Sequence, residues 1–244
     1  MTSTFTTREI MIAAAAREIR DGEVVFVGMR LPLVAFAVAK KLHASTAIGV
    51  FENGVLRDRS ASQPIVTMGD PPNLSGALAC TGLMEVMSLL QHGRVDLGFI
   101  GGAEIDRFGN LNTTFTQGLR LPGSGGAADI ASFARRTVII MMHEKRRFQE
   151  RVVYCTSLGY GEGHDWRRTV GLPGGGPSKV VTSMGVYGFA EDGEMELDSL
   201  HPGGTVDEVR ANTGWNLRVA PAVTATPAPT AEELRLIRQF DTLG

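Results

Sequence analysis

Short apolar runs alternate along this chain with longer amphipathic segments, and this alternation constrains the possible fold more than any other feature. An apolar run that ends at glycine or at a turn signal is typical of a buried strand, whereas apolar residues spaced three and four apart indicate a helix. The expected strands cover residues 24–27, 47–51, 95–100, 137–142, 152–155, 179–182 and 186–189. The alternation predicts an α/β fold with an open, largely parallel sheet flanked by helices.

The helices have recognisable ends. Thr6-Thr7-Arg8-Glu9 has the pattern of a capping box, in which a threonine and a glutamate satisfy each other's main-chain amides at the start of a helix. Further helices are expected over 33–42 and 81–91, and residues 53–73 look irregular. The whole chain, 1–244, is expected to form one domain, in which a linker over 221–230 leads to a final helix over 230–240.

Composition excludes several classes of function. The net charge of −2 gives no reason to expect a nucleic-acid partner or an anionic membrane partner. No apolar stretch approaches the ~18 residues of a membrane span. Two cysteines make a disulfide framework unexpected and fit a reducing cytoplasm. The five histidines lie far apart, and without a paired-cysteine motif no metal site is expected.

Nucleotide-binding and serine-hydrolase motifs are also missing from the sequence. There is no Gly-x4-Gly-Lys-Ser/Thr loop for phosphoryl transfer and no Gly-x-Ser-x-Gly elbow for a nucleophilic serine. The segment 123–127, Gly-Ser-Gly-Gly-Ala, lacks the Gly-x-Gly-x-x-Gly spacing of a dinucleotide site. A dinucleotide-binding oxidoreductase is therefore a weak interpretation.

Glu52 is the residue whose position suggests chemistry. It ends the apolar run 47–51 and is followed by Asn53-Gly54, a strong turn signal. A carboxylate held at the end of a buried strand can be shielded from water and act as a nucleophile or a base. The alternative is an ordinary glutamate that points into solvent.

Glycine clusters are the second feature that suggests a site. Gly101-Gly102 follows the strand expected at 95–100, and further clusters lie at 123–126 and 174–176. Main-chain amides in such loops can stabilise an oxyanion, although turn geometry alone also explains them. The run from His143 to Phe148 is cationic, and could bind an anion or form the solvated face of a helix.

Several short motifs occur in order along the chain. They are Val27-Gly28 with Leu31-Pro32-Leu33, Val38-Ala39-Lys40, residues 101–106 with Gly109-Asn110-Leu111-Asn112, residues 123–127, residues 142–148, residues 171–177, Asn212-Thr213-Gly214-Trp215 and Leu236-Ile237-Arg238. Taken together and in this order, they resemble the motifs of the β subunits of family I CoA-transferases, most closely the glutaconate type. In that family the catalytic glutamate stands in a Ser-Glu-Asn-Gly turn. Phe51-Glu52-Asn53-Gly54 matches this pattern, with Phe51 in place of serine.

The resemblance implies an enzyme that transfers CoA by covalent catalysis. Glu52 would attack an acyl-CoA, and the enzyme would pass through a glutamyl-CoA thioester before a second carboxylic acid takes the CoA. Gly125 and Gly126 are implied as oxyanion donors, and Asn112 and Gly102 are further candidates for oxyanion or CoA binding. No cofactor or metal is implied, because the CoA thioester itself is the substrate.

The resemblance also implies a partner. The family builds its active site between an α and a β subunit, so a separate α subunit should form a heterodimer or a larger (αβ)n oligomer with this chain. The glutaconate type favours a dicarboxylic acyl group. Arg30, Arg57, Arg59 and Arg120 could pair with its distal carboxylate, although each could also be a surface charge.

Three other functions remain open at this point. Relatives with the same fold hydrolyse or decarboxylate CoA thioesters and lack the glutamate, so Glu52 favours transfer. Glu104, a second carboxylate beside glycines, could serve water-based chemistry or have a structural role. A non-catalytic subunit that binds acyl-CoA would be expected to have lost the carboxylate at the strand end.

Overall fold

The chain forms two compact units in the computed structural model, which describes residues 4–116 and 118–242. The first unit is built from the chain up to Phe99 and again from Ala228 onward, and the second from Ile100–Pro227. The single domain expected over 1–244 stays a prediction, since compact units of one chain need not fold or act independently. Among the described residues, no helix has the length and apolarity needed to cross a membrane.

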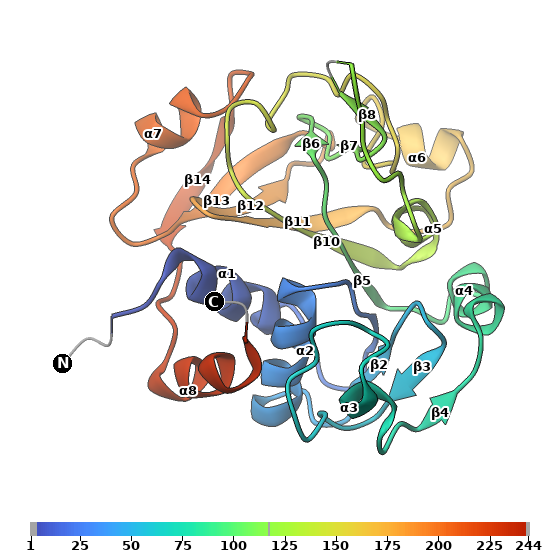
Figure 1. Cartoon of the computed structure of the whole chain (residues 1–244). Coiled ribbons are helices and arrows are strands. Elements are labelled where there is room, and N and C mark those ends of the chain that lie inside the picture. The colour runs from blue at the N-terminus through green and yellow to red at the C-terminus, as the bar shows by residue number, and fades with distance from the viewer. Residues whose placement is uncertain (1–3, 117, 243–244) are drawn as a thin grey trace. The chain divides into compact units, whose positions relative to one another are not determined.

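The first unit is an α/β layer structure (Figure 1). Its elements are α1 (Thr7–Arg17), β1 (Val24–Phe26), α2 (Leu31–Leu42), β2 (Ile48–Val50), β3 (Val55–Arg57), α3 (Pro71–Leu74), β4 (Ala79–Cys80), α4 (Leu83–Gln91), β5 (Leu97–Ile100) and α8 (Ala231–Phe240). β1 pairs in parallel with β2 and with β5, and β3 and β4 extend the sheet in antiparallel fashion beyond β2. The carboxyl ends of β1 and β2 therefore lie at the same edge of the sheet.

Three helices of the first unit pack on one another: α1 and α2 from the start of the chain, and α8 from its end. Figure 1 shows α8, in red, beside the blue α1 and α2. Arg17 forms an ion pair with Glu233 at 2.7 Å, and Arg238 forms one with Glu9 at 2.6 Å. These pairs attach the last helix to the first one.

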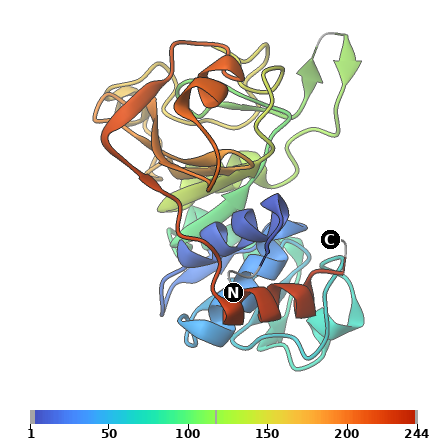
Figure 2. The ribbon, with the colours of Figure 1, turned by 90° about the vertical axis from the view of Figure 1, so that its left-hand side faces the viewer.

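The second unit contains a larger sheet and two short hairpins. Its elements are β6 (Glu104–Ile105), β7 (Leu111–Asn112), β8 (Phe115–Thr116), β9 (Leu119–Arg120), α5 (Ala127–Phe133), β10 (Arg136–Met141), α6 (Trp166–Thr169), β11 (Pro177–Thr182), β12 (Gly185–Phe189), β13 (Met195–Leu200), α7 (Val206–Ala211) and β14 (Arg218–Ala225). β10 and β11 pair in parallel, as do β13 and β14, and β12 lies antiparallel between β11 and β13. Figure 2 shows the β8–β9 hairpin, in light green, projecting from this unit.

The expected α/β fold, an open sheet with flanking helices, is confirmed. The capping box at Thr6 is also present: the Glu9 amide donates to Thr6 Oγ1 at 3.2 Å and the Thr6 amide donates to Glu9 Oε2 at 2.7 Å. The final helix begins after Thr230, as expected, with a second capping box between Thr230 and Glu233. Strong local signals thus predicted where these two helices begin.

Other expectations were wrong. Residues 152–155 form no strand; Val153 and Tyr154 are exposed, so their apolar character does not reflect burial in a sheet. The region 53–73 contains β3 and the start of α3, and the elements β13 and α7 were missed. The first half of the supposed linker 221–230 belongs to β14, because its main chain pairs with β13. After His143 the chain forms a single turn, in which the amides of Arg147 and Phe148 donate to the Glu144 carbonyl. It does not continue as a helix, because the next amide, that of Gln149, donates to the Ile105 carbonyl instead.

A buried aromatic cluster in the second unit contains a histidine with a defined tautomer. The His143 ring stacks on Phe148, with 3.7 Å between ring centroids. The Thr213 hydroxyl donates to the Val209 carbonyl at 2.8 Å, so it can only accept from His143 Nε2, which lies 3.2 Å away. His143 therefore carries its proton on Nε2, and its Nδ1 accepts from the Tyr187 hydroxyl at 2.9 Å.

This histidine should make folding stability depend on pH. Burial lowers the pKa of His143 to about 4 from a normal value of 6.5. Because the unfolded chain takes up the proton more readily, stability is present above pH ~6.5 and is lost as the pH falls toward 4. Between pH 7 and pH 5 we expect a loss of about 2 kcal/mol from this group, measured by urea unfolding.

The variant His143→Gln, which cannot titrate, should lose most of this dependence. A smaller part should remain because burial also lowers the pKa of His201. His92→Gln is the matched control, since it replaces an exposed histidine outside this buried cluster by the same residue. An unaltered pH dependence in His143→Gln would contradict the assignment.

Candidate active site

Glu52 lies in a tight turn directly after β2. The Phe51 amide donates to the Val55 carbonyl at 2.9 Å, and the Gly54 amide donates back to the Phe51 carbonyl at 2.9 Å. The turn therefore connects the antiparallel strands β2 and β3, and places Glu52 and Asn53 at its two central positions. Glu52 is half-buried, as a group must be if it is to be both shielded and reachable by a substrate.

The turn is fixed from outside by residues distant in sequence. The main-chain amide and the hydroxyl of Thr81 both donate to the Gly54 carbonyl, at 2.8 and 2.9 Å. On the other side, the Asn53 side-chain amide donates to the Met68 carbonyl at 2.8 Å. The residues that flank Glu52 in the chain are thus anchored, and the backbone that carries the carboxylate is rigid.

Gly54 is required by the close packing of this turn. Its φ is +98°, a conformation that L side chains rarely adopt, and a Cβ there would lie 2.3 Å from the Thr81 carbonyl oxygen. Phe51, which stands where the family pattern has serine, is 1% exposed and meets Phe36 edge-on with 6.2 Å between ring centroids. The departure from that pattern thus anchors the turn in the core of the first unit.

Arg57, the last residue of β3, stabilises the segment around α3. It is 2% exposed, and its guanidinium donates to the carbonyls of Asn73 at 2.5 Å, Ser75 at 3.0 Å and Pro72 at 3.2 Å. Its donors are occupied by the main chain around α3, so Arg57 is neither a surface charge nor a group that pairs with a substrate carboxylate. The sequence offered no local signal for this role, because the carbonyls come from a separate segment.

In the second unit, Asn112 and Glu104 form a buried pair across the β6–β7 hairpin. Asn112 is 0% exposed; its amide nitrogen donates to Glu104 Oε2 at 2.7 Å and to the Phe115 carbonyl at 2.6 Å. Its oxygen accepts from the amides of Thr114 and Phe115. Both amide hydrogens are thus used within the second unit, and a part for Asn112 in oxyanion or CoA binding stays a prediction.

Glu104 has a structural role in this arrangement. It is 4% exposed and accepts hydrogen bonds from Asn112 and from the Thr116 hydroxyl, so both carboxylate oxygens have partners. The carboxylate borders a pocket of about 390 Å³ whose lining is Ala103, Glu104, Thr116, Leu119, Leu121, Arg146 and Arg147. Its hydrogen bonds hold the hairpin that forms one wall of this pocket.

The glycine candidates of the second unit, Gly102 and the 123–126 loop, lie before and after the β6–β7 hairpin in the chain. Gly102 precedes the hairpin, and a Cβ on it would crowd the Glu104 carbonyl oxygen at 3.0 Å and the end of the Leu111 side chain at 2.8 Å. The 123–126 loop is joined to the same region because the Gly123 amide donates to the Thr113 carbonyl at 2.8 Å. Gly125 is exposed with φ +49°, and Gly126 is buried and precedes α5.

The predicted site residues are therefore divided between the two units. Glu52 belongs to the first unit, whereas Gly102, Asn112, Gly125 and Gly126 belong to the second. Within the second unit the structure brings the glycine loop and the Asn112 hairpin together. Thr81, Met68 and Thr116 were missed, since each acts on a site residue far from it in sequence.

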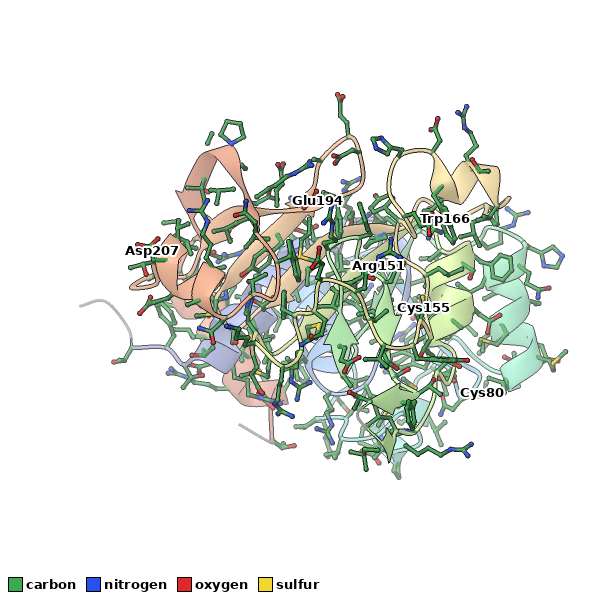
Figure 3. The ribbon with its side chains drawn as sticks, turned by 90° about the horizontal axis from the view of Figure 1, so that it is seen from above. Cys80, Arg151, Cys155, Trp166, Glu194 and Asp207 are labelled. Carbon is green, nitrogen blue, oxygen red and sulfur yellow. The ribbon has the colours of Figure 1, made fainter. Side chains whose placement is uncertain are left out.

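Cys155 is a poor candidate for nucleophilic catalysis. Cys80 and Cys155 are free thiols, and Figure 3 shows Cys155 with Arg151 on the irregular segment between β10 and α6. Burial of the sulfur and the nearby Asp106 raise the pKa of Cys155 to about 11, so the thiol stays protonated at neutral pH. In the ranges 4–116 and 118–242, no cluster of His, Cys, Asp and Glu could hold a metal ion.

Comparison with known proteins gives a consistent result. Residues 8–212 match the family model described as coenzyme A transferase. The chain is 38% identical to the B subunit of 3-oxoadipate CoA-transferase from Pseudomonas knackmussii, over 98% of this chain and 94% of that protein. It is 35% identical to the B subunit of glutaconate CoA-transferase from Acidaminococcus fermentans, over 96% of this chain and 92% of that protein.

Solved structures agree with the sequence comparison. The crystal structure of glutaconate coenzyme A-transferase from Acidaminococcus fermentans matches with a TM-score of 0.90 and 34% identity, over 98% of this chain and 95% of that chain. The structure of the decarboxylase AibA/AibB matches with a TM-score of 0.84 and 25% identity, over 99% and 97% of the two chains. Proteins of similar structure thus include both a CoA-transferase and a decarboxylase.

Proposed function

The chain belongs to the coenzyme A transferase family, and from this premise we propose that it moves CoA between an acyl-CoA and a dicarboxylic acid through a thioester on Glu52. The observation that carries the proposal is the Glu52 turn, in which the carboxylate follows a buried strand and its neighbours are anchored by Thr81 and Met68. A nucleophile held in this way loses little entropy when it attacks. The chain is a CoA-transferase of the β-subunit type.

The proposed reaction begins with attack on the thioester. A Glu52 carboxylate oxygen adds to the acyl carbonyl carbon, the C–S bond breaks, and CoA leaves as the thiolate. The product is a mixed anhydride between the acyl group and Glu52. The thiolate then adds to the glutamyl carbonyl carbon, the anhydride bond breaks, and the first carboxylic acid leaves.

The second half reverses these steps with another acid. The enzyme now holds a glutamyl-CoA thioester, whose bond energy is retained for transfer, so neither ATP nor a metal or organic cofactor is required. The incoming carboxylate attacks the glutamyl carbonyl and releases the thiolate, which then takes the new acyl group from the anhydride. Ping-pong kinetics follow from this order.

Each addition creates a negatively charged oxygen that needs hydrogen-bond donors. We assign this role to the main chain at Gly125 and Gly126, supported by the left-handed conformation of Gly125 and by the attachment of the loop to Thr113. Asn112 contributes by holding Glu104 and the adjacent hairpin. Gly102 contributes by leaving room for the side chain of Leu111 on β7, one strand of that hairpin.

The proposed partners follow from the relatives. Two similar proteins are named as the B subunits of their enzymes, which supports an α subunit that completes the enzyme as a heterodimer or a larger (αβ)n assembly. Their names refer to 3-oxoadipate and glutaconate, both acids with two carboxyl groups, which supports a dicarboxylic substrate. A cytoplasmic location is part of the same proposal.

The test is a search for the covalent intermediate. With the co-expressed α subunit and an acyl-CoA, we expect a CoA adduct on the peptide that contains residues 51–54, detected by mass spectrometry. Hydroxylamine should remove the adduct, because it cleaves thioesters. The adduct should disappear when a carboxylic acid acceptor is added.

The similarity to the decarboxylase AibA/AibB makes a second outcome worth measuring. If the complex releases carbon dioxide from an acyl-CoA, or frees CoA without an acceptor acid, and forms no adduct, the chemistry is decarboxylation or hydrolysis. Glu52 favours transfer because a carboxylate nucleophile can hold CoA between the two halves of the reaction.

A further inference from the structure

The structure distinguishes among the four arginines that could recognise a substrate carboxylate. Arg57 is buried and donates to main-chain carbonyls. Arg59 is exposed but forms an ion pair with Asp58 at 3.0 Å. Arg120 is also exposed, but it lies on β9, which among the described strands pairs only with β8, so no strand register places it beside Glu52. Arg30 is exposed, and within residues 4–116 and 118–242 its side chain makes no ion pair or hydrogen bond.

Arg30 has an unusual backbone conformation. It precedes α2 with φ 65° and ψ −113°, and this ψ lies outside the left-handed region that residues other than glycine occasionally occupy. An arginine in this conformation costs free energy that a glycine would not. No contact of its side chain within the described chain offsets the cost, so a role outside the chain would explain why an arginine stands there.

The strand register places Arg30 at the same edge of the sheet as Glu52. β1 and β2 are parallel, with Phe26 opposite Val50, and the Val27 amide donates to the Val50 carbonyl at 2.8 Å. Neighbouring strands lie about 5 Å apart. The loop that carries Arg30 therefore leaves the carboxyl end of β1 beside the point where the Glu52 turn leaves β2.

The loop between β1 and α2 is held in place. Gly28 lies against β5, where a Cβ would be 2.9 Å from the Phe99 carbonyl oxygen. On its other side the Leu33 amide donates to the Arg30 carbonyl at 3.0 Å, which begins α2. Arg30 is thus presented from a rigid segment, as a residue that selects between substrates has to be.

We propose that Arg30 determines specificity by pairing with the distal carboxylate of the acyl group that reacts at Glu52. This inference rests on the proposed function. A guanidinium matches a carboxylate with two parallel hydrogen bonds, and a cation near the sheet edge adds attraction for the charge. A monocarboxylic acyl group of equal length has nothing to pair with Arg30.

The test compares two substrates that differ only in the distal group, glutaryl-CoA and pentanoyl-CoA. The rate of adduct formation on Glu52 is measured by mass spectrometry with the complete complex. In Arg30→Ala we expect this rate to fall about 10- to 100-fold for glutaryl-CoA and by less than about 3-fold for pentanoyl-CoA. Arg59→Ala, which removes an exposed arginine of the same unit, should leave both rates unchanged.

Equal losses with both substrates would overturn the proposal, because the CoA phosphates are common to the two and Arg30 would then act on them. No loss with either would overturn it as well. If the wild-type complex forms no adduct with any acyl-CoA, the proposed function itself fails, and the role of Arg30 fails with it. Adduct formation with an unchanged substrate preference in Arg30→Ala would remove the role of Arg30 alone.

A second variant separates the effect of the Arg30 side chain from the effect of its strained backbone. Arg30→Gly removes the charge and also relieves the backbone strain, so we expect its Tm to rise by a few degrees while the preference for glutaryl-CoA is lost. A purely structural arginine would give the opposite result, a lower Tm with an unchanged preference. That result would overturn the proposal.

Discussion

Replacing Glu52 by glutamine is expected to abolish CoA transfer while leaving the fold intact. The amide cannot attack a thioester, so no anhydride and no glutamyl-CoA thioester can form. We expect a loss of about 10⁴-fold or more in kcat, the scale seen when a covalent nucleophile is removed. The hydrogen bonds of Thr81 and Asn53 that fix this turn do not use the Glu52 side chain, so the variant should still fold.

The measurement is steady-state transfer in the complex with its α subunit, together with urea unfolding of the same variant. Glu191→Gln is a suitable control, because Glu191 is an exposed carboxylate in a turn of the second unit. The variant Glu52→Ala guards against slow conversion of the glutamine back to glutamate. Transfer at the wild-type rate in Glu52→Ala would show that another group is the nucleophile.

Replacing Gly54 by alanine is expected to affect both folding and activity. The new Cβ would lie 2.3 Å from the Thr81 carbonyl oxygen, and the φ of +98° would be strained for any L side chain. The clash is with the backbone, so it cannot be relieved by a change of rotamer. We expect a loss of about 3–5 kcal/mol in unfolding free energy.

The fall in kcat in Gly54→Ala should be larger than the loss of folded protein accounts for. To accommodate the Cβ, the turn must move away from Thr81, and Glu52 moves with it. A shift of about 1 Å at a reacting group can cost about 10²-fold in rate, which should remain visible in kcat at temperatures where the variant is folded. Transfer in the complex, measured alongside far-UV circular dichroism, gives both quantities.

Gly76 provides a matched comparison. Its φ is +69°, but a Cβ there would meet nothing within 4 Å. The unfolding free energy of Gly76→Ala should therefore fall by only about 1–2 kcal/mol, the cost of the backbone conformation, and the variant should transfer CoA normally. If the two alanine variants were equally stable and equally active, the close approach of Thr81 to Gly54 would not be what fixes the Glu52 turn.

The sequence predicted the elements whose local signals are strong. The capping box at Thr6 depends on residues three apart, so the pattern alone was enough to find the start of that helix, and the final helix expected over 230–240 is also present. Prediction from the sequence failed where strand pairing decided the structure. The segment 221–225 has the composition of a linker, yet it is a strand because β13 offers it hydrogen-bond partners.

The candidate site shows the same division. The turn signal Asn53-Gly54 was enough to place Glu52 at the end of a strand, and the order of the motifs was enough to indicate the family. Asn112 was also named from the sequence. However, its hydrogen bonds to Glu104 and Phe115 give it a supporting role, which depends on how the hairpin folds back on itself.

By itself, then, the sequence determined the α/β class, the residue that carries the proposed nucleophile, and four arginines that could select a substrate. Tertiary structure alone decided what surrounds each of them. Thr81 and Met68 fix the Glu52 turn, Arg57 is occupied by the carbonyls near α3, and Arg30 stands in a strained loop with no charged partner among the described residues. The physical reason is that turns and caps form between neighbours in sequence, whereas burial and hydrogen-bond partners come from segments that only folding brings together.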